Sequence, residues 1–557
     1  MPLHQFDYLF AIGMIFAFLD AWNIGANDVA SSFATSVSSR SLTYPQAMCI
    51  AAICEFSGAM ILGNRVSETI RNKIIDIDLF AESPATLLLA MVTAVIGSSL
   101  WLTFATRIGA PVSTTHSIVG AIIGSGLACF GTDSILWGWS GVAQIAVSWF
   151  VAPVLAGVFA SILFLFTKIC VLEREEKRLR NAFYVLPVYY CFTASVLCLV
   201  IIWNGGTETG NPSTLVIICA VIATAVVTLI VYLLFFLPFY RRRVIDEDWT
   251  LRWYHVFMGV LLYKRGIVPP RPDGVDVVND YYTHSTAVHS TDEERDRYTK
   301  RSADLPVNTT TATHDTALDR LFCRLERFID DGADMKWYNI HGCTTRLWRA
   351  FTHGIRQDVL SSSSSFLAGD VQRRNLHAQH YDNKVEHLYS FLQALTAATT
   401  SFAHGANDVS NAVGPLSTIF VIWKTNTLGT HTSVPLWILL YGSLAIVLGL
   451  WTYGYHVMRN LGNRLTLHSP SRGFAMELGA ALTTILATRL ALPVSTTQSI
   501  VGATVFVGLC SGDVKAVNYR MVGWCYLGWM LTVPCAGLIS GGLCAFIINA
   551  PHYMREY

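Results

Sequence analysis

Charged residues are scarce in this chain of 557 residues: they make up 14% of it, whereas hydrophobic residues make up 52%. Soluble domains usually carry about 25% charged residues, so the deficit indicates a lipid environment. The formal net charge is only +1. No basic surplus exists that could neutralise a nucleic-acid backbone, and we expect no nucleic-acid partner.

The 13 cysteines lack the paired CxxC spacing of zinc sites, and most of them lie in apolar runs. Cysteine in such a run behaves as a small hydrophobic residue, so we expect neither a disulfide framework nor a zinc site. The beginning of the chain also lacks the basic region of a cleavable signal, because its first Lys or Arg is Arg40. This stretch is therefore interpreted as a retained first membrane span.

Apolar segments long enough to cross a bilayer recur along the chain, and they predict an all-α polytopic membrane protein. We count about twelve, near 6–36, 44–63, 86–106, 111–130, 138–167, 185–203, 213–239, 387–423, 434–457, 473–490, 493–511 and 520–549. Two pairs, 86–130 and 473–511, are interrupted by Arg107–Pro111 and Arg489–Pro493. A proline break at membrane depth predicts a broken or re-entrant helical hairpin as readily as two spans, and it is tolerated only beside a cavity or within protein.

The distribution of Lys and Arg predicts the topology. Basic residues at 168–180 and 241–243 flank the pair of spans at 185–239, so that side is expected to be cytoplasmic and both termini external. Three regions follow: an N-terminal membrane repeat with its linking spans (1–240), a hydrophilic cytoplasmic loop that is partly disordered (241–386), and a C-terminal membrane repeat (387–557). The loop contains a stretch near 316–358 with the apolar spacing of a surface helix.

Two motifs occur twice in the same order. NIGANDVASSFATSV (23–37) matches AHGANDVSNAVGPLS (403–417), and RIGAPVSTTHSIVGA (107–121) matches RLALPVSTTQSIVGA (489–503). The charge count orients the two copies oppositely. Inverted-topology repeats of this kind place a substrate site near the bilayer midplane, at the interface between the halves.

The first motif places Asp28 and Asp408 within apolar spans, where a carboxylate is costly and normally functional. Gly25 and Gly405 would let the backbone break or approach a neighbour closely. Carboxylate oxygens with the amide oxygens of Asn27 and Asn407 suit Na⁺, a hard cation, although a buried Asp could instead carry a proton.

The PVSTT segments read as helix starts after a break, with serine and threonine as capping residues. A helix N-terminus binds anions through free N–H groups and partial positive charge, so two of them could hold one tetrahedral oxyanion. The candidate donors are Ser113, Thr114, Thr115, Ser495, Thr496 and Thr497, with Ser117 and Ser499 as additional donors. Asn27 and Asn407 are candidate ligands of the substrate as well as of the cation.

Two further acids, Glu55 and Glu477, lie in apolar surroundings and are candidate cation sites. His116 is replaced by Gln498 in the second copy, which excludes an obligatory titrating role in both halves. Arg107 and Arg489 lie at the hairpin ends, where such side chains usually extend towards the interface.

With these residues in view, the chain resembles the inorganic phosphate transporter (PiT) family of sodium-dependent phosphate symporters. The doubled GANDV and PVSTT motifs carry the resemblance, which covers about 1–240 and 385–550 but not the central loop. It implies orthophosphate as substrate, Na⁺ or H⁺ as the coupling ion rather than a resident cofactor, and roles in transport for Asp28, Asp408, Glu55 and Glu477. Ser31, where the family usually has Asn, the Ser38-Ser39-Arg40 run and Gln498 depart from the family pattern.

The sequence therefore predicts a transporter rather than an enzyme, importing phosphate with Na⁺ in preference to H⁺ by alternating access. The plasma membrane is the default location, and a homodimer is compatible with this interpretation. Three alternatives stay open: a sulfate or other oxyanion permease, a nutrient sensor that binds without transport, and an intramembrane aspartyl hydrolase using Asp28 and Asp408.

Overall fold

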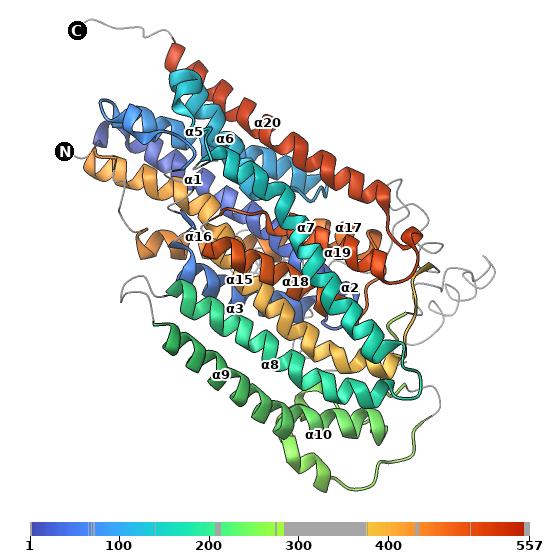
Figure 1. Ribbon diagram of the computed structural model, residues 1–557. Helices are drawn as coiled ribbons and strands as arrows, with labels where there is room; N and C mark the ends of the chain where they lie inside the picture. The colour runs from blue at the N-terminus through green and yellow to red at the C-terminus, as the bar shows by residue number, and fades with distance from the viewer. Residues whose placement is uncertain are drawn as a thin grey trace, which may run out of the picture.

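The computed structural model describes residues 3–64, 73–139, 141–205, 213–272, 276–282, 377–428, 434–490 and 492–550, together with residues 66, 67, 70 and 375. The predicted surface helix near 316–358 and most of the predicted disordered loop lie outside these ranges. Within them the chain is helical, and its only β-pairing is two isolated bridges. Figure 1 shows the helices as one bundle whose axes run in broadly similar directions.

The first half begins with a continuous helical segment made of α1 (Asp7–Ile24), a π-helical turn (Gly25–Val29) and α2 (Ala30–Ser38). It continues with α3 (Tyr44–Leu62), α5 (Pro84–Arg107), α6 (Thr114–Phe130) and α7 (Val142–Thr167). The second half contains α15 (Asn383–Thr425), α16 (Leu436–Tyr453), α17 (Tyr455–Arg464), α18 (Pro470–Arg489), α19 (Thr496–Cys510) and α20 (Tyr519–Asn549). Between the halves, α8 (Arg178–Gly205), α9 (Thr214–Val231) and the short α10 (Leu237–Tyr240) lie along one edge of the bundle (Figure 1).

Nine helical segments of the described chain are long and apolar enough to cross a membrane. They agree with the predicted multi-pass membrane protein. The three other predicted segments are also helical, as α15, α18 and α19, but they do not meet the same criteria of length and apolarity. The figure of twelve crossings accordingly stays a prediction.

The proline breaks divide helices as predicted. The helix α5 ends at Arg107 and α6 begins at Thr114, and α18 ends at Arg489 before α19 begins at Thr496. Of the two alternatives predicted for the glycines of the GAND motifs, a break in the helix or a close approach of a neighbour, the break occurs in neither half. In the first copy the helix passes through Gly25–Val29 as a π-helical turn, and in the second it runs unbroken through Gly405 within α15.

The glycines of these motifs allow a neighbouring helix to pack closely against the backbone. A Cβ on Gly25 would lie 1.8 Å from the carbonyl oxygen of Ile446 on α16, and one on Gly405 would lie 2.3 Å from that of Glu55 on α3. The partner helices also have a glycine at each contact: Gly449 on α16 faces the carbonyl oxygen of Trp22, and Gly58 on α3 faces that of Phe402. The pairs α1–α16 and α15–α3 are thus packed in the same way.

The last helix of each half packs on the other half. Gly120 and Gly124 of α6 meet Val533 and Gly537 of α20, whereas Gly502 of α19 meets Pro153 of α7. Two more helix pairs join the halves in the same way: α5 packs on α20, and α18 packs on α7. Contacts that interchange in this way are what a two-fold relation between the halves produces. The opposite orientation of the halves across a membrane stays a prediction.

The start of α1 and the end of α20 lie at the same end of the bundle, and Arg241–Ile245 lies at the opposite end (Figure 1). This arrangement is compatible with termini on one side and the central loop on the other. At the loop end, Arg243 is buried and donates hydrogen bonds to the backbone oxygens of Asp248, Trp249 and Leu251. These bonds hold the chain where it leaves the helical segment that ends at Ile245.

Candidate functional site

The two hairpin turns meet the acidic motifs in the interior. Ser113 and Ser495 cap α6 and α19 as predicted, because their hydroxyl oxygens accept hydrogen bonds of 3.2 Å from the N–H groups of His116 and Gln498. The first helical residues, Thr114 and Thr496, are fully buried. The sequence therefore builds two helix N-termini inside the protein, each following a proline.

Asp28 is held by one threonine from each half. Thr114 Oγ1 donates to Asp28 Oδ2 at 2.5 Å, and Thr497 Oγ1 donates to Asp28 Oδ1 at 2.6 Å. Asp408 receives only one such bond, from Thr496 Oγ1 to its Oδ2 at 2.6 Å. Its second oxygen, Oδ1, is buried without a hydrogen-bond partner. The two carboxylates are thus inequivalent, and that of Asp408 keeps an acceptor available.

His404 links Asp408 to Glu55. Its Nε2 lies 2.8 Å from Asp408 Oδ2, and its Nδ1 lies 2.8 Å from Glu55 Oε2. Only the contact at Nδ1 has the geometry of a hydrogen bond, and the contact at Nε2 is an ion pair when the imidazole carries a proton on both nitrogens. Ser401 donates to the other oxygen of Glu55 at 2.7 Å. Glu55 is therefore joined to the central acids through His404.

Asp28, His404 and Asp408 each offer a ligand atom, and these atoms lie within 4.8 Å of one another in a buried cluster. The carboxylate oxygens in that space suit a small hard cation, and the imidazole is a further ligand only where its nitrogen carries no proton. The sequence interpretation named the two acids but missed His404. One feature of the sequence could have identified His404: the two repeats differ at this position, where the first copy has Ile24.

Asn27 and Asn407 hold the hairpin turns. Asn27 donates to Thr106 Oγ1 and to Ala110 O, and its Oδ1 accepts from Val112 N–H at 3.2 Å. Asn407 donates to Val494 O at 3.3 Å. Both asparagines were predicted as ligands of the cation and of the substrate. In this conformation the amide of Asn27 is fully used, so its role here is to position the turn.

Thr115, in the first half, forms two hydrogen bonds with the second half. Its hydroxyl donates to Val494 O at 3.4 Å and accepts from Asn411 Nδ2 at 3.2 Å. Asn411 also donates to Thr114 Oγ1 at 3.1 Å. Within the described chain, the N–H groups of Thr115, Thr496 and Thr497 have no protein acceptor. Free N–H groups at two helix N-termini are the elements of an anion site.

Glu477 forms a separate polar cluster. Its Oε1 accepts from Thr35, Ser36 and Gln393 at 2.6, 2.6 and 3.0 Å, and its Oε2 accepts from Thr396 at 2.6 Å. A carboxylate with four donors is satisfied without a bound ion. The structure therefore does not bring Glu477 together with the central acids.

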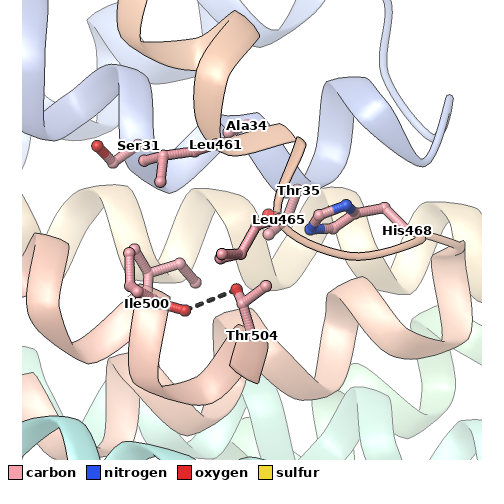
Figure 2. Close-up of a pocket in the computed structure, with 9 residues that line it drawn as sticks. Ser31, Ala34, Thr35, Leu461, Leu465, His468, Ile500 and Thr504 are labelled. Atoms are coloured by element: carbon pink, nitrogen blue, oxygen red, sulfur yellow. Dashed lines mark hydrogen bonds between the residues drawn. The ribbon is translucent and has the colours of Figure 1, made fainter. Parts of the chain in front are cut away.

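A small cavity lies next to α2, lined in part by Ser31 and Thr35. It has room for about one water molecule (about 10 Å³). Figure 2 shows Ser31, Thr35 and His468 around it, with Thr504 bonded to Ile500 O of its own helix at 2.7 Å. Ser31 donates to Asn27 O, and Thr35 contacts Glu477, so the cavity is adjacent to both polar clusters.

The remaining candidates lie away from the acids. His116 is buried against the ring of Trp149, and neither ring nitrogen has a hydrogen-bond partner. Ser117 is paired with Ser98, and Ser499 donates to Ser495 O within its own helix. Arg107 is exposed, as expected of an arginine at a hairpin end.

Known proteins resemble this chain over nearly its whole length. The profile of the Phosphate transporter family matches residues 24–540. The "Phosphate-repressible phosphate permease pho-4" of Neurospora crassa is 47% identical, with 99% of each chain covered. The human "Sodium-dependent phosphate transporter 2" is 29% identical over 98% of this chain and 99% of its own.

A solved structure titled "The sodium-dependent phosphate transporter" has the same fold, with a TM-score of 0.65 over 97% of this chain and 99% of its own at 24% identity. The family and these relatives are transporters and permeases, which agrees with the prediction that the chain is not an enzyme. The matching profile spans nearly the whole chain, including both GANDV and both PVSTT motifs, and the chain therefore belongs to the phosphate transporter family.

Proposed function

We propose that this protein imports inorganic phosphate together with Na⁺ by alternating access of two halves oriented oppositely in the membrane. The observation that carries the proposal is the double attachment of Asp28 to Thr114 and Thr497, one threonine from each half. A site built from both halves at once must change when they move relative to each other. The names of the relatives supply phosphate and sodium as the substrates to test.

The need for a cation follows from the charges. Asp28 and Asp408 have ligand atoms within 4.8 Å of each other, and His404 is the one residue of that cluster able to carry a positive charge. Two like charges about 5 Å apart repel by roughly 3 kcal/mol even at an effective dielectric constant of 20. Adding phosphate between the helix N-termini increases this repulsion unless a cation enters with it.

Na⁺ is favoured over a proton by the hydrogen bonds. Both oxygens of Asp28 accept hydroxyl protons, which is the pattern of an ionised carboxylate rather than a protonated one. Asp408 Oδ1 is the open oxygen ligand. Phosphate is favoured over sulfate because its remaining proton can be donated to a carboxylate, whereas sulfate has none to donate.

We assign the substrate to the free N–H groups of Thr115, Thr496 and Thr497 with the adjacent hydroxyls, and the cation to Asp28, Asp408 and the nearby Glu55. The plasma membrane, external termini and a cytoplasmic central loop complete the proposal. No resident cofactor is required, since Na⁺ is cargo.

The test is uptake of labelled phosphate into proteoliposomes under an imposed Na⁺ or pH gradient. We expect Na⁺-driven uptake by the wild type, little competition by excess sulfate, and loss of uptake in Asp28→Asn and Asp408→Asn. Uptake that ignores the Na⁺ gradient would contradict the coupling, and phosphate binding without flux would indicate a sensor.

A further inference from the structure

Asp20 is a buried acid that the proposed site does not use. It lies on α1, two helical turns before Asp28, and its exposure is 0%. Neither carboxylate oxygen has a hydrogen-bond partner. Ser98 on α5 is its polar neighbour, but the Ser98 hydroxyl donates to Ser117 Oγ at 3.0 Å. The carboxylate is thus left without a donor in the protein interior.

Asn23, three residues further along α1, presents a second acceptor. Its Nδ2 is directed at Leu19 O at 2.8 Å, Thr103 Oγ1 at 2.9 Å and Ser99 O at 3.3 Å. Two of these three partners are carbonyl oxygens, so the amide cannot be turned round without placing oxygen against oxygen. Its Oδ1 therefore points away from them, and it is buried without a partner.

The two acceptors are neighbours on one helix face, because residues three apart in an α-helix lie side by side. Burying an acceptor without a donor is costly, and burying an ionised carboxylate in this way costs more. A cation bound between them removes both costs. Carboxylate and amide oxygens are ligands for hard cations such as Na⁺.

The second half has no such arrangement. Thr400 and Ala403 stand at the positions that match Asp20 and Asn23 in the repeat. On α18, the residues that match Ser98, Ser99 and Thr103 are Ala480, Ala481 and Ile485. The structure supports this alignment of α5 with α18, because Gly97 packs on α20 in the way that Gly479 packs on α7. The polar set is therefore not a by-product of the duplicated motifs.

We propose that Asp20 and Asn23 Oδ1 form an additional Na⁺ site, present in the first half only, about 12 Å along α1 from the cluster around Asp28. The inference rests on the proposed Na⁺-coupled function and deepens it. The ion at Asp20 is transported with phosphate and adds one Na⁺ to each cycle.

The experiment is the ratio of ²²Na⁺ to [³²P]phosphate taken up by proteoliposomes, for the wild type and for Asp20→Asn. We expect the variant to carry one Na⁺ fewer per phosphate, and its half-maximal Na⁺ concentration to change at least threefold. Ser125→Ala is the matched control, because Ser125 is a buried hydroxyl on α6 that is paired with Thr93. An unchanged ratio in Asp20→Asn would overturn the site and indicate a neutral structural acid.

A second variant and a binding measurement keep the test independent of folding. Asn23→Ala removes the other ligand and is expected to change the ratio in the same direction. In detergent, we expect NaCl to raise the thermal unfolding temperature of the wild type more than that of Asp20→Asn, with N-methylglucamine chloride as reference. Equal Na⁺-dependent shifts in both proteins would also overturn the inference. Absence of Na⁺-driven uptake in the wild type would instead refute the function on which the inference rests.

Discussion

Thr497, at the start of α19 in the second half, donates a hydrogen bond of 2.6 Å to Asp28, which belongs to the first half. The residues lie 469 positions apart in the sequence. The matching bond in the other direction is absent from the described residues: Thr115, which corresponds to Thr497, donates to Val494 O and not to Asp408. The central site is built from a repeat but is not symmetric.

Thr497→Val is expected to lower phosphate uptake at limiting substrate by roughly 10- to 100-fold, since a hydrogen bond to a charged group contributes about 1.5–3 kcal/mol. Thr504→Val, on the same helix, is the control, because its hydroxyl bonds to Ile500 O of its own helix. Initial rates of labelled phosphate uptake measure both. Equal rates in the two variants would show that the bond across the halves does not contribute.

His404→Ala is expected to abolish uptake and to lower stability, because it leaves Glu55 and Asp408 buried without their shared partner. Removing one member of a buried charged group costs about 3–5 kcal/mol. His116→Gln is the matched control: it removes another buried histidine and installs the residue that the second copy carries. Uptake and thermal unfolding should distinguish the two, and a functional His404→Ala protein would contradict the role assigned to the imidazole.

Glu477→Ala tests whether this acid is structural. Four side chains donate to it from α2 and α15, so its removal leaves several buried hydroxyl and amide groups unsatisfied. We expect a lower unfolding temperature, whereas the Na⁺:phosphate ratio of the protein that folds stays that of the wild type. A changed ratio would return Glu477 to the list of cation ligands.

Gly25→Ala and Gly405→Ala are expected to prevent correct assembly, because the added methyl group would overlap backbone oxygens at 1.8 and 2.3 Å. Gly523→Ala, which has nothing within 4 Å of the added carbon, should be tolerated. The amount of monodisperse protein after membrane extraction measures this. Normal yield of the first two variants would contradict the packing described for α1–α16 and α15–α3.

Much of the fold could be predicted from the sequence, because apolar length and proline position are local signals. The ends of α5 and α18 and the serine caps of α6 and α19 followed directly from the PVSTT segments. The continuous helix through Gly405 could not, since whether a glycine breaks a helix or admits a neighbour depends on what packs against it. Here the backbone at Glu55 fills the space.

The site could be predicted in its chemistry but not in its pairing. Duplication identified Asp28, Asp408 and the threonines as candidates, whereas the contacts of His404 with Glu55 and of Asn411 with Thr114 join helices that are distant in sequence. Glu55 and Glu477 looked alike because each is an acid in an apolar run. Only the fold separates them, giving one a histidine and a serine and the other four neutral donors.

The exchange of terminal helices between the halves has a consequence for biosynthesis. Ser540 of α20 donates to Ala121 O of α6, and these residues are 419 positions apart. At about 5–20 residues per second, a ribosome needs roughly 20–80 s to add that length of chain. For this time α6 has no α20 to pack on, and its glycine-lined face must be covered by lipid or by a helper protein. A chain truncated before α20 should therefore be recognised as incomplete, although every residue of the central site has already been synthesised.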